Sequence, residues 1–493
     1  MAFPPPPPAY VAVQAHDWMQ GVDLDNTDMG IRTELFKVSD AYVLRRINLL
    51  DKRELPLFQA LGRWQAWGVA RRQIPELNES QDVIPTYDLW DDEWGEVQAP
   101  FRPGAAADLA ASKALGVLDM CHTYLGTSAL DDLVDRFFDE YDGRPVRFAD
   151  FYTRFRALAP GDRPLPNWAE FEGWMTQAGH PILETAIRGD RLSVTQRPFT
   201  LYPDDNYHNQ GALFTVPLLV KYKDSRGVRQ QPVLLRPGQM SIELGAVGPL
   251  RWAYLNGGGH GWFRTRFPEA ERLALNEDVA QDLNPAEQCA YACNQWRMVR
   301  HGSEPVGRFY EILLALKDKA EPAMLDLMLT EMGAQRFFVR PEDLLAFDRF
   351  AADVLGPVAR RQGLNFTSGD SRKRTIHRAL CLRALARTGD AEALKLAAQL
   401  ADRWKAGEKL PGWDMENLGG DPEVYERLSD KAQRQPTPSN LRALASWPEK
   451  TGAYLGVDQI LDPATPLSDE QRASLVSNLV YMTPAVDRIW DAF

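Results

Sequence analysis

The chain has few histidines for its length, with only seven among its 493 residues. A helix-borne zinc site of the HExxH type needs two imidazoles four positions apart on one helical face and a glutamate beside the first as general base. No two histidines of the chain have this spacing. The sequence therefore lacks that zinc motif. The histidines are His16, His122, His180, His208, His260, His301 and His377.

Cysteine is also scarce, with four residues in the whole chain. So few cysteines do not make a disulfide framework, and we expect a reduced, cytoplasmic protein. Cys289 and Cys293 lie four positions apart on a predicted helix. Two ligands do not make a zinc site, so we interpret this pair as small buried side chains.

Long apolar runs and a basic surplus are missing as well. No apolar run is close in length to the ~20 residues that are needed to span a bilayer. The first residues, MAFPPPPPAYVAV, have no basic segment followed by an apolar one, so we expect no signal peptide. The net charge of −12 leaves no cationic excess to neutralise phosphates. We therefore expect neither nucleic acid nor a membrane as a partner.

The length predicts several domains, because 493 residues exceed what one core holds. An apolar content of 44% and a charged content of 25% are typical of globular proteins. We expect a mainly α, multidomain protein with a helical N-terminal part, a small antiparallel β-sandwich and an α-α solenoid-like C-terminal domain. The expected segments are 1–100 (a divergent region with a proline-rich tail at Pro4–Pro8), 101–182 (helical), 183–267 (sandwich) and 268–493 (helical).

Local patterns support this organisation. Apolar residues at helical spacing predict helices, and short β-branched or alternating runs between turn signals predict strands. Asn284-Pro285-Ala286-Glu287 has the pattern of a capped helix start. The predicted helices are 39–50, 57–72, 105–125, 131–141, 148–158 and 168–178, and the predicted strands are 192–196, 214–223, 233–235, 241–244 and 251–255.

Short motifs recur in a fixed order over residues 100–493, in segments that follow the order helical, β, helical. The motifs are Ser112–Met120 with Cys121–Gly126, Phe137–Phe155, Phe171–Pro181, Leu192–Phe199, Thr215–Leu218, Leu255–Asn256 with Gly261–Arg264, Leu283–Gln288, Gly363–Ala386 and Asp487–Trp490. Together they resemble the aminopeptidase N type of zinc metallopeptidase. The resemblance implies that 101–182 is the end of a thermolysin-like catalytic domain, followed by a β-sandwich and a HEAT-like helical domain.

The chain departs from that family at the positions of its chemistry. The resemblance implies an oxyanion-stabilising tyrosine where this chain has Ala111, and a glycine where it has Ala114. It also implies a zinc helix near residues 30–70, which contain no histidine, and a Gly-x-Met-x-Asn loop, which is missing. We therefore predict no catalytic, cofactor-binding or metal-ligating residue in this chain. Zinc would be present only if a partner subunit supplied it.

Other motifs have simpler interpretations. Residues 23–34 have calcium-loop spacing, but Asp28 stands where a glycine is needed. Gly257–Gly261 is glycine-rich, yet it follows a strand and opens no helix, so we interpret it as a turn and not as a phosphate cradle. Arg372-Lys373-Arg374 could hold a peptide carboxylate, although a solvated helix start is the simpler interpretation.

Aromatic residues are interpreted mainly as packing residues. His122 lies on an apolar helix, so we interpret it as a core histidine whose ring nitrogens have hydrogen-bond partners. The acidic, aromatic segment Tyr87–Gln98 is interpreted as a solvated loop pinned by its tryptophans. Six tryptophans are interpreted as core or interdomain packing, namely Trp168, Trp174, Trp252, Trp262, Trp296 and Trp490.

Three functional hypotheses remain. The first is a non-catalytic scaffold, adaptor or peptide-binding protein related to aminopeptidase N. The second is the non-zinc subunit of a split metalloaminopeptidase, whose zinc-bearing half is another chain and packs on an apolar surface of residues 1–130. The third is a hydrolase with an unrecognised acidic site near residues 85–100. The first two require a protein partner, and the first also allows a peptide ligand.

Overall fold

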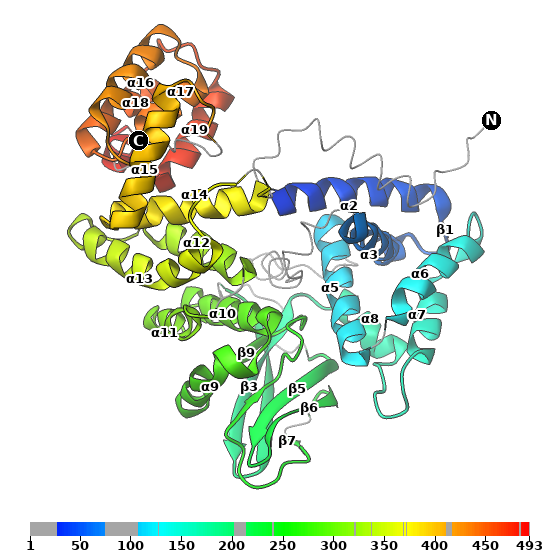
Figure 1. Cartoon of the computed structure of the whole chain (residues 1–493). Helices are drawn as coiled ribbons and strands as arrows, with labels where there is room; N and C mark the ends of the chain where they lie inside the picture. Colours follow the sequence, from blue (N-terminus) through cyan, green and yellow to red (C-terminus); the bar gives the residue numbers. More distant parts are fainter. Residues whose placement is uncertain are drawn as a thin grey trace. The chain divides into compact units, whose positions relative to one another are not determined.

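The chain folds into two compact units, Met1–Leu316 and Lys317–Phe493, in the computed structural model (Figure 1). Helices predominate in both units, and the strands lie in the first, so the prediction of a mainly α, multidomain fold is confirmed. No helix of the described part is long and apolar enough to cross a bilayer. The structure describes residues 27–73, 107–126, 128–201, 213–238, 241–319, 322–336, 338–367, 369–370, 372–410, 417–482 and 485–492.

The first unit begins with a layer of three helices, α2 (Thr27–Arg46), α3 (Leu55–Gln73) and α5 (Ala107–Leu125). Helix α3 packs between the other two. Asp40 of α2 pairs with the buried Arg63 of α3 through two contacts of 3.0 and 2.6 Å, so an ion pair supplements the apolar packing. The predicted helices 57–72 and 105–125 are confirmed.

The helix predicted at 39–50 starts earlier and ends earlier. Helix α2 stops at Arg46, because Asn48–Leu49 form a short strand, β1, that pairs in parallel with β2 (Pro145–Val146). The apolar residues there have helical spacing, but pairing with β2 holds Asn48–Leu49 in an extended conformation.

The next helices enclose a cluster of aromatic rings. They are α6 (Ala129–Glu140), α7 (Phe148–Ala157) and α8 (Trp168–Thr176), and they confirm three further predictions. Asn167 caps α8 by accepting from the Glu170 N–H at 3.0 Å, and Glu170 accepts from the Asn167 N–H at 2.7 Å. Within the cluster, Phe148 packs edge-on against Phe58 with ring centroids 5.4 Å apart.

Two small sheets follow. One has the strand order β7-β4-β3-β9 and the other the order β6-β5-β8. The five predicted strands correspond to β4 to β8, with shifted ends, whereas β3 and β9 were not predicted. The bounds are β3 His180–Arg188, β4 Arg191–Phe199, β5 Val216–Asp224, β6 Gly227–Leu235, β7 Ser241–Ile242, β8 Trp252–Tyr254 and β9 Arg264–Arg266.

The sheets are antiparallel except where β9 pairs in parallel with β3, for example Ile182 with Arg264. The expectation of a purely antiparallel sandwich is wrong at this edge. A parallel pair needs a long crossover, and here the intervening strands of both sheets provide it. No periodicity could indicate this pairing, since β9 has only three residues.

One continuous apolar core joins the helices to the sandwich. It runs from Leu35 on α2 to Phe263 beside β9. The fully buried ring of Trp262 lies against Gly116 of α5, so closely that a Cβ atom at position 116 would overlap the indole. The segments expected at 1–100, 101–182 and 183–267 therefore share one core, and their boundaries remain predictions.

The first unit ends with α9 (Glu269–Asp282), α10 (Pro285–Arg300) and α11 (Gly307–Leu316). The predicted cap of α10 is confirmed. The Asn284 side chain accepts from the Glu287 N–H at 2.9 Å, and the Glu287 carboxylate accepts from the Asn284 N–H at 2.8 Å.

The second unit is helical throughout its described residues, and α12 to α15 each pack on the next, as a solenoid-like array requires. Its last helices close around a second apolar core that includes Leu441, Leu444 and Val457. The helices are α12 Pro322–Arg336, α13 Leu344–Gln362, α14 Arg372–Arg387, α15 Ala391–Lys405, α16 Pro422–Arg434, α17 Pro438–Ala445, α18 Lys450–Leu461, α19 Asp469–Met482 and α20 Val486–Trp490.

We predict that Gly116→Ala destabilises the first unit by about 1–3 kcal/mol, because the new methyl group must displace the Trp262 ring. Urea unfolding followed by tryptophan fluorescence measures the change. Gly161→Ala is the control, since its Cβ would meet no atom within 4 Å. Equal stability of both variants would contradict the proposed contact.

Candidate functional site

The glycine-rich loop after β8 is the point where helices and sheets of the first unit meet. The Gly257 N–H donates to the carbonyl of Leu219 on β5 at 2.8 Å. Within the loop, the Gly259 N–H donates to the Asn256 carbonyl at 2.9 Å, and the Gly261 N–H donates to Asn256 Oδ1 at 2.7 Å. Because these N–H groups already have protein acceptors, the loop is a turn and not a phosphate cradle.

Glycine is required here by close packing as well as by backbone angle. Gly258 and Gly259 have φ values of 82° and 85°, which side-chain-bearing residues rarely adopt. A Cβ at Gly258 would lie 2.6 Å from Thr123 of α5, and one at Gly259 would lie 2.8 Å from the carbonyl of Ala286. The loop thus packs closely between α5 and the start of α10.

Glu287 binds this loop to its surroundings. Its carboxylate, 1% exposed, accepts from Lys221 Nζ of β5 at 2.7 Å and from the Gly258 N–H at 2.9 Å. It also accepts from the N–H of Asn284, as described above. The buried negative charge therefore has one cation and two backbone donors, which offset the cost of its burial.

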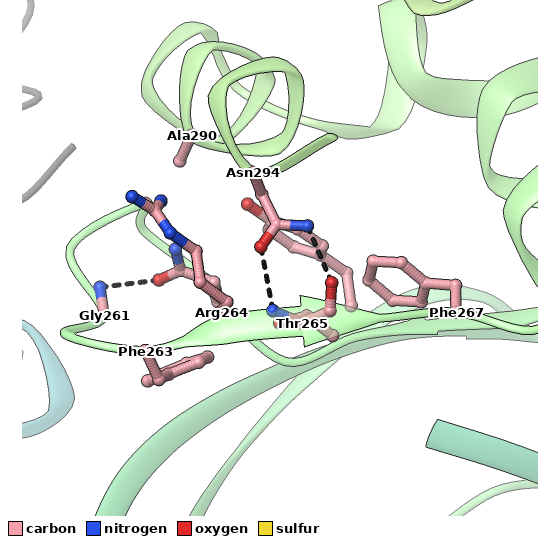
Figure 2. Close-up of a pocket in the computed structure, with 10 residues that line it drawn as sticks. Gly261, Phe263, Arg264, Thr265, Phe267, Ala290 and Asn294 are labelled. Carbon is pink, nitrogen blue, oxygen red and sulfur yellow. Dashed lines mark hydrogen bonds between the residues drawn. The ribbon is translucent and has the colours of Figure 1, made fainter. Parts of the chain in front are cut away.

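Two shallow hollows flank the loop. Figure 2 shows one of them, where Asn294 reaches from α10 and forms two hydrogen bonds, of 2.8 and 2.7 Å, with the backbone of Thr265. The other is lined by Thr123 and His260, among others. Side chains fill both hollows so closely that each has room for little more than a water molecule. Neither is large enough for a peptide or a nucleotide.

A mostly buried histidine–carboxylate pair lies beside the second hollow, which His260 helps to line. His260 Nδ1 and Asp119 Oδ2 are 2.7 Å apart, and the side chains are 18% and 8% exposed. Burial by itself would lower the pKa of His260, but the charge and hydrogen bond of Asp119 outweigh it and raise that pKa above its ordinary value, with Arg71 opposing. No local pattern in the sequence indicates this pair, because its members are 141 positions apart.

Residues 252–417 match the family model of the ERAP1-like C-terminal domain. The chain therefore contains an ERAP1-like C-terminal domain. The match covers about a third of the chain and supports the resemblance over those residues. It begins at β8 and includes the loop, Glu287 and Asn294, so these residues lie in the first part of the matched segment.

Upstream of the matched segment, the positions that the resemblance links to catalysis serve packing. Ala111 and Ala114 of α5 are fully buried. The buried Lys113 donates to the carbonyls of Gln177 and Gly179 at 3.2 and 2.6 Å, so its ammonium group joins α5 to the chain just before β3.

The structure also describes the histidine and the cysteines that the sequence singled out. His122 is only half-buried, so a core histidine is not the right description, and its ring packs edge-on against Trp64 with centroids 4.9 Å apart. Cys289 and Cys293 are buried, as expected. Among the described residues, no three His, Cys, Asp or Glu side chains lie together as a metal site would require.

The tryptophan interpretation is wrong at one position. Trp174, Trp252 and Trp262 are fully buried, but Trp490 is 55% exposed. Ile489 takes the buried position of α20, and the next residue points about 100° away around the helix. Trp168 and Trp296 are half-buried.

Several motifs fall partly or wholly outside the described residues. These are the proline run Pro4–Pro8, the acidic segment Tyr87–Gln98, residues 23–26 of the calcium-like loop and the side chains of Arg372 and Lys373. The remaining residues of that loop, 27–34, lie in helix α2. Arg374 is described and is exposed, which fits the interpretation of a solvated helix start.

We predict a pH-dependent stability from the His260–Asp119 pair. A histidine with a raised pKa stabilises the fold fully below the ordinary value of about 6.5 and loses that contribution as the pH rises through its folded pKa. The free energy of unfolding, relative to that of His260→Asn, should therefore fall as the pH rises above about 6.5 and the folded-state imidazolium loses its proton.

His301→Asn is the control of opposite sign. Burial lowers the pKa of His301, helped by the nearby Arg266, so its contribution is present above about pH 6.5 and is lost as the pH falls. Urea unfolding from pH 5 to 9 compares the variants. The same pH trend in both, or no trend for His260→Asn, would contradict the assignment.

Proposed function

We propose that this chain is a non-catalytic binding protein related to aminopeptidase N, acting as a scaffold or adaptor for a protein partner or as a holder of peptides. The observation that carries the proposal is the combination of an aminopeptidase C-terminal domain with a fully buried alanine, Ala111, where the resemblance implies the oxyanion tyrosine. The proposed setting is the cytoplasm, a proposal that rests on the low cysteine content.

The residues around Ala111 support the proposed loss of catalytic activity. A residue that stabilises an oxyanion must reach the substrate with a hydrogen-bond donor. Ala111 has no donor and no contact with solvent. Two residues later, the Lys113 ammonium binds two backbone carbonyls, which fixes it in a structural position. Helix α5 thus has a packing role along the segment where the peptidase family needs an accessible polar face.

The split-enzyme alternative requires a large apolar surface on residues 1–130. Among the described residues of that range, the exposed large apolar side chains are Val38, Leu44 and Leu50. Val38 and Leu44 share the outer face of α2 with the exposed Lys37 and Arg45. Within these described residues, the exposed apolar side chains of α2 form a narrow stripe with basic neighbours, which suits a modest contact.

The proposal is tested by purifying the full chain, measuring bound metal by mass spectrometry and assaying aminoacyl anilide cleavage with and without added zinc. We expect a folded protein with no stoichiometric zinc and no turnover. Turnover with one bound zinc per chain would overturn both the scaffold and the split-enzyme hypotheses. Turnover restored only by a co-purifying HExxH chain would favour the split enzyme, and metal-independent turnover would favour the unrecognised hydrolase.

We further predict that restoring the tyrosine does not restore activity. Ala111→Tyr inserts a phenol into a closed core and should cost about 1–3 kcal/mol of stability or more, without any gain of anilide cleavage in the presence of zinc. Ala41→Tyr, on the exposed face of α2, should change stability by no more than about 0.5 kcal/mol. A stable Ala111→Tyr variant with zinc-dependent activity would show that the position faces a working site.

A further inference from the structure

Strand β6 forms an edge of the second small sheet. In the order β6-β5-β8 it pairs with β5 alone, and Figure 1 shows it beside β5. It has nine residues, which is as long as its partner. An edge strand of this length has a row of backbone groups with which a further strand can pair, unless the protein covers or blocks them. What the edge can bind therefore depends on which backbone groups face outward.

The hairpin turn between β5 and β6 determines this direction. Asp224 and Gly227 are the pair next to a two-residue turn, so they face each other as a hydrogen-bonded pair, and every second residue after Gly227 also faces β5. The residues between them, which include Val228, Gln230 and Pro232, direct their backbone groups away from β5. Proline fits this direction, because it has no N–H and is tolerated in a strand where that group would face the edge.

The hydrogen bonds on the other side of β5 agree with this alternation. Lys223 is opposite Val228 in the register, and its carbonyl accepts from the Arg251 N–H at 2.8 Å. Leu219 is opposite Pro232, and its carbonyl accepts from the glycine-rich loop at 2.8 Å. Both carbonyls therefore face away from β6. Since the two residues of such a pair direct their backbone groups to opposite sides, Val228 and Pro232 face the open edge.

The outward backbone groups have no partner within the described part of the chain. Val228 is 37% exposed, and Gln230 is exposed as well. A neighbouring loop meets β6 through a side chain of the alternate set, because Gln231 donates to the Glu243 carbonyl at 3.0 Å and accepts from the Gly245 N–H at 3.2 Å. No described residue forms a hydrogen bond with the outward N–H and carbonyl groups of Val228 and Gln230. These groups are open to an incoming strand.

The charge of the edge distinguishes between possible occupants. Residues 226–236 contain three arginines and no acidic residue, in a chain whose net charge is −12. Two of the three pair with carboxylates of the same unit. The third, Arg226 at the turn end of the edge, is exposed and has no ion pair among the described residues. Two copies of this edge would bring basic side chains together, whereas an acidic strand would complement them.

We propose that the edge of β6 binds an extended peptide segment with an acidic residue, which adds to the sheet as a further strand. Val228 and Gln230 supply N–H donors and carbonyl acceptors at the two-residue spacing of a strand, and Pro232 supplies one more carbonyl. The acidic residue lies at the end of the segment that is beside Arg226. The site rests on the proposed role in binding a protein or peptide, and it specifies the conformation and the charge of the bound segment.

The test uses fluorescein-labelled heptapeptides of alternating valine and threonine with a glutamate at one end or at the other, so that both strand directions are covered. Matched peptides have lysine in place of glutamate. Fluorescence anisotropy with the full chain at low ionic strength measures each Kd. We expect one glutamate peptide to bind roughly three- to fivefold more tightly than its lysine counterpart, because the ion pair with Arg226 is exposed. Arg226→Glu should reverse this preference.

A second variant blocks the edge itself. Gln230→Pro removes an outward N–H and leaves the ladder with β5 intact, as Pro232 does in the natural sequence. Binding of the glutamate peptide should weaken by roughly tenfold, while circular dichroism stays that of the wild type. If Gln230→Pro does not fold, the charge reversal at Arg226 decides alone.

The matched control is Arg191→Glu, which reverses an exposed arginine beside the hairpin turn of the other sheet and should leave the peptide preference unchanged. The site is overturned if no peptide of the set binds, if Arg226→Glu and Arg191→Glu have equal effects, or if sedimentation shows that the edge pairs with a second copy instead. A failure of the site leaves the chain without turnover in the zinc assay, whereas a failure of the proposed function appears as turnover. The two failures are therefore distinguishable.

Discussion

The contact between Trp262 and Gly116 determines how the first unit is assembled. A helix can approach an indole ring this closely only where it has no side chain, and α5 has a glycine at that position. The contact brings the sandwich onto the helical layer and draws the loop before Trp262 against Thr123 and the start of α10. The hydrogen bonds of the loop, the buried Glu287 and the His260–Asp119 pair all follow from that approach.

Sequence patterns predicted what depends on neighbouring residues. The capped start of α10, the aromatic-rich α7 and the turn at Gly257–Gly261 are set by local spacing, by caps and by glycine angles, and the structure confirms them. The sequence contains no comparable pattern for contacts between residues that are far apart along the chain. His260 and Asp119 come together only because the sheet packs on α5, and β9 is a strand only because β3 offers it an edge.

Two residues of α5 fit the proposed non-catalytic role. The Lys113 side chain donates to backbone carbonyls, and Ala111 packs in the core. Several buried polar groups of this unit bind one another across elements, as Glu287 does with Lys221. Such contacts make the framework of the unit more rigid.

The segment that matches the ERAP1-like C-terminal domain starts at Trp252, the first residue of β8. The hydrogen-bonding partner of β8 is β5, which lies upstream of the match. The match also continues past Leu316, where the first compact unit ends. The matched residues therefore do not contain the whole sheet to which their first strand belongs. A fragment that began at Trp252 would lack the strand that pairs with β8.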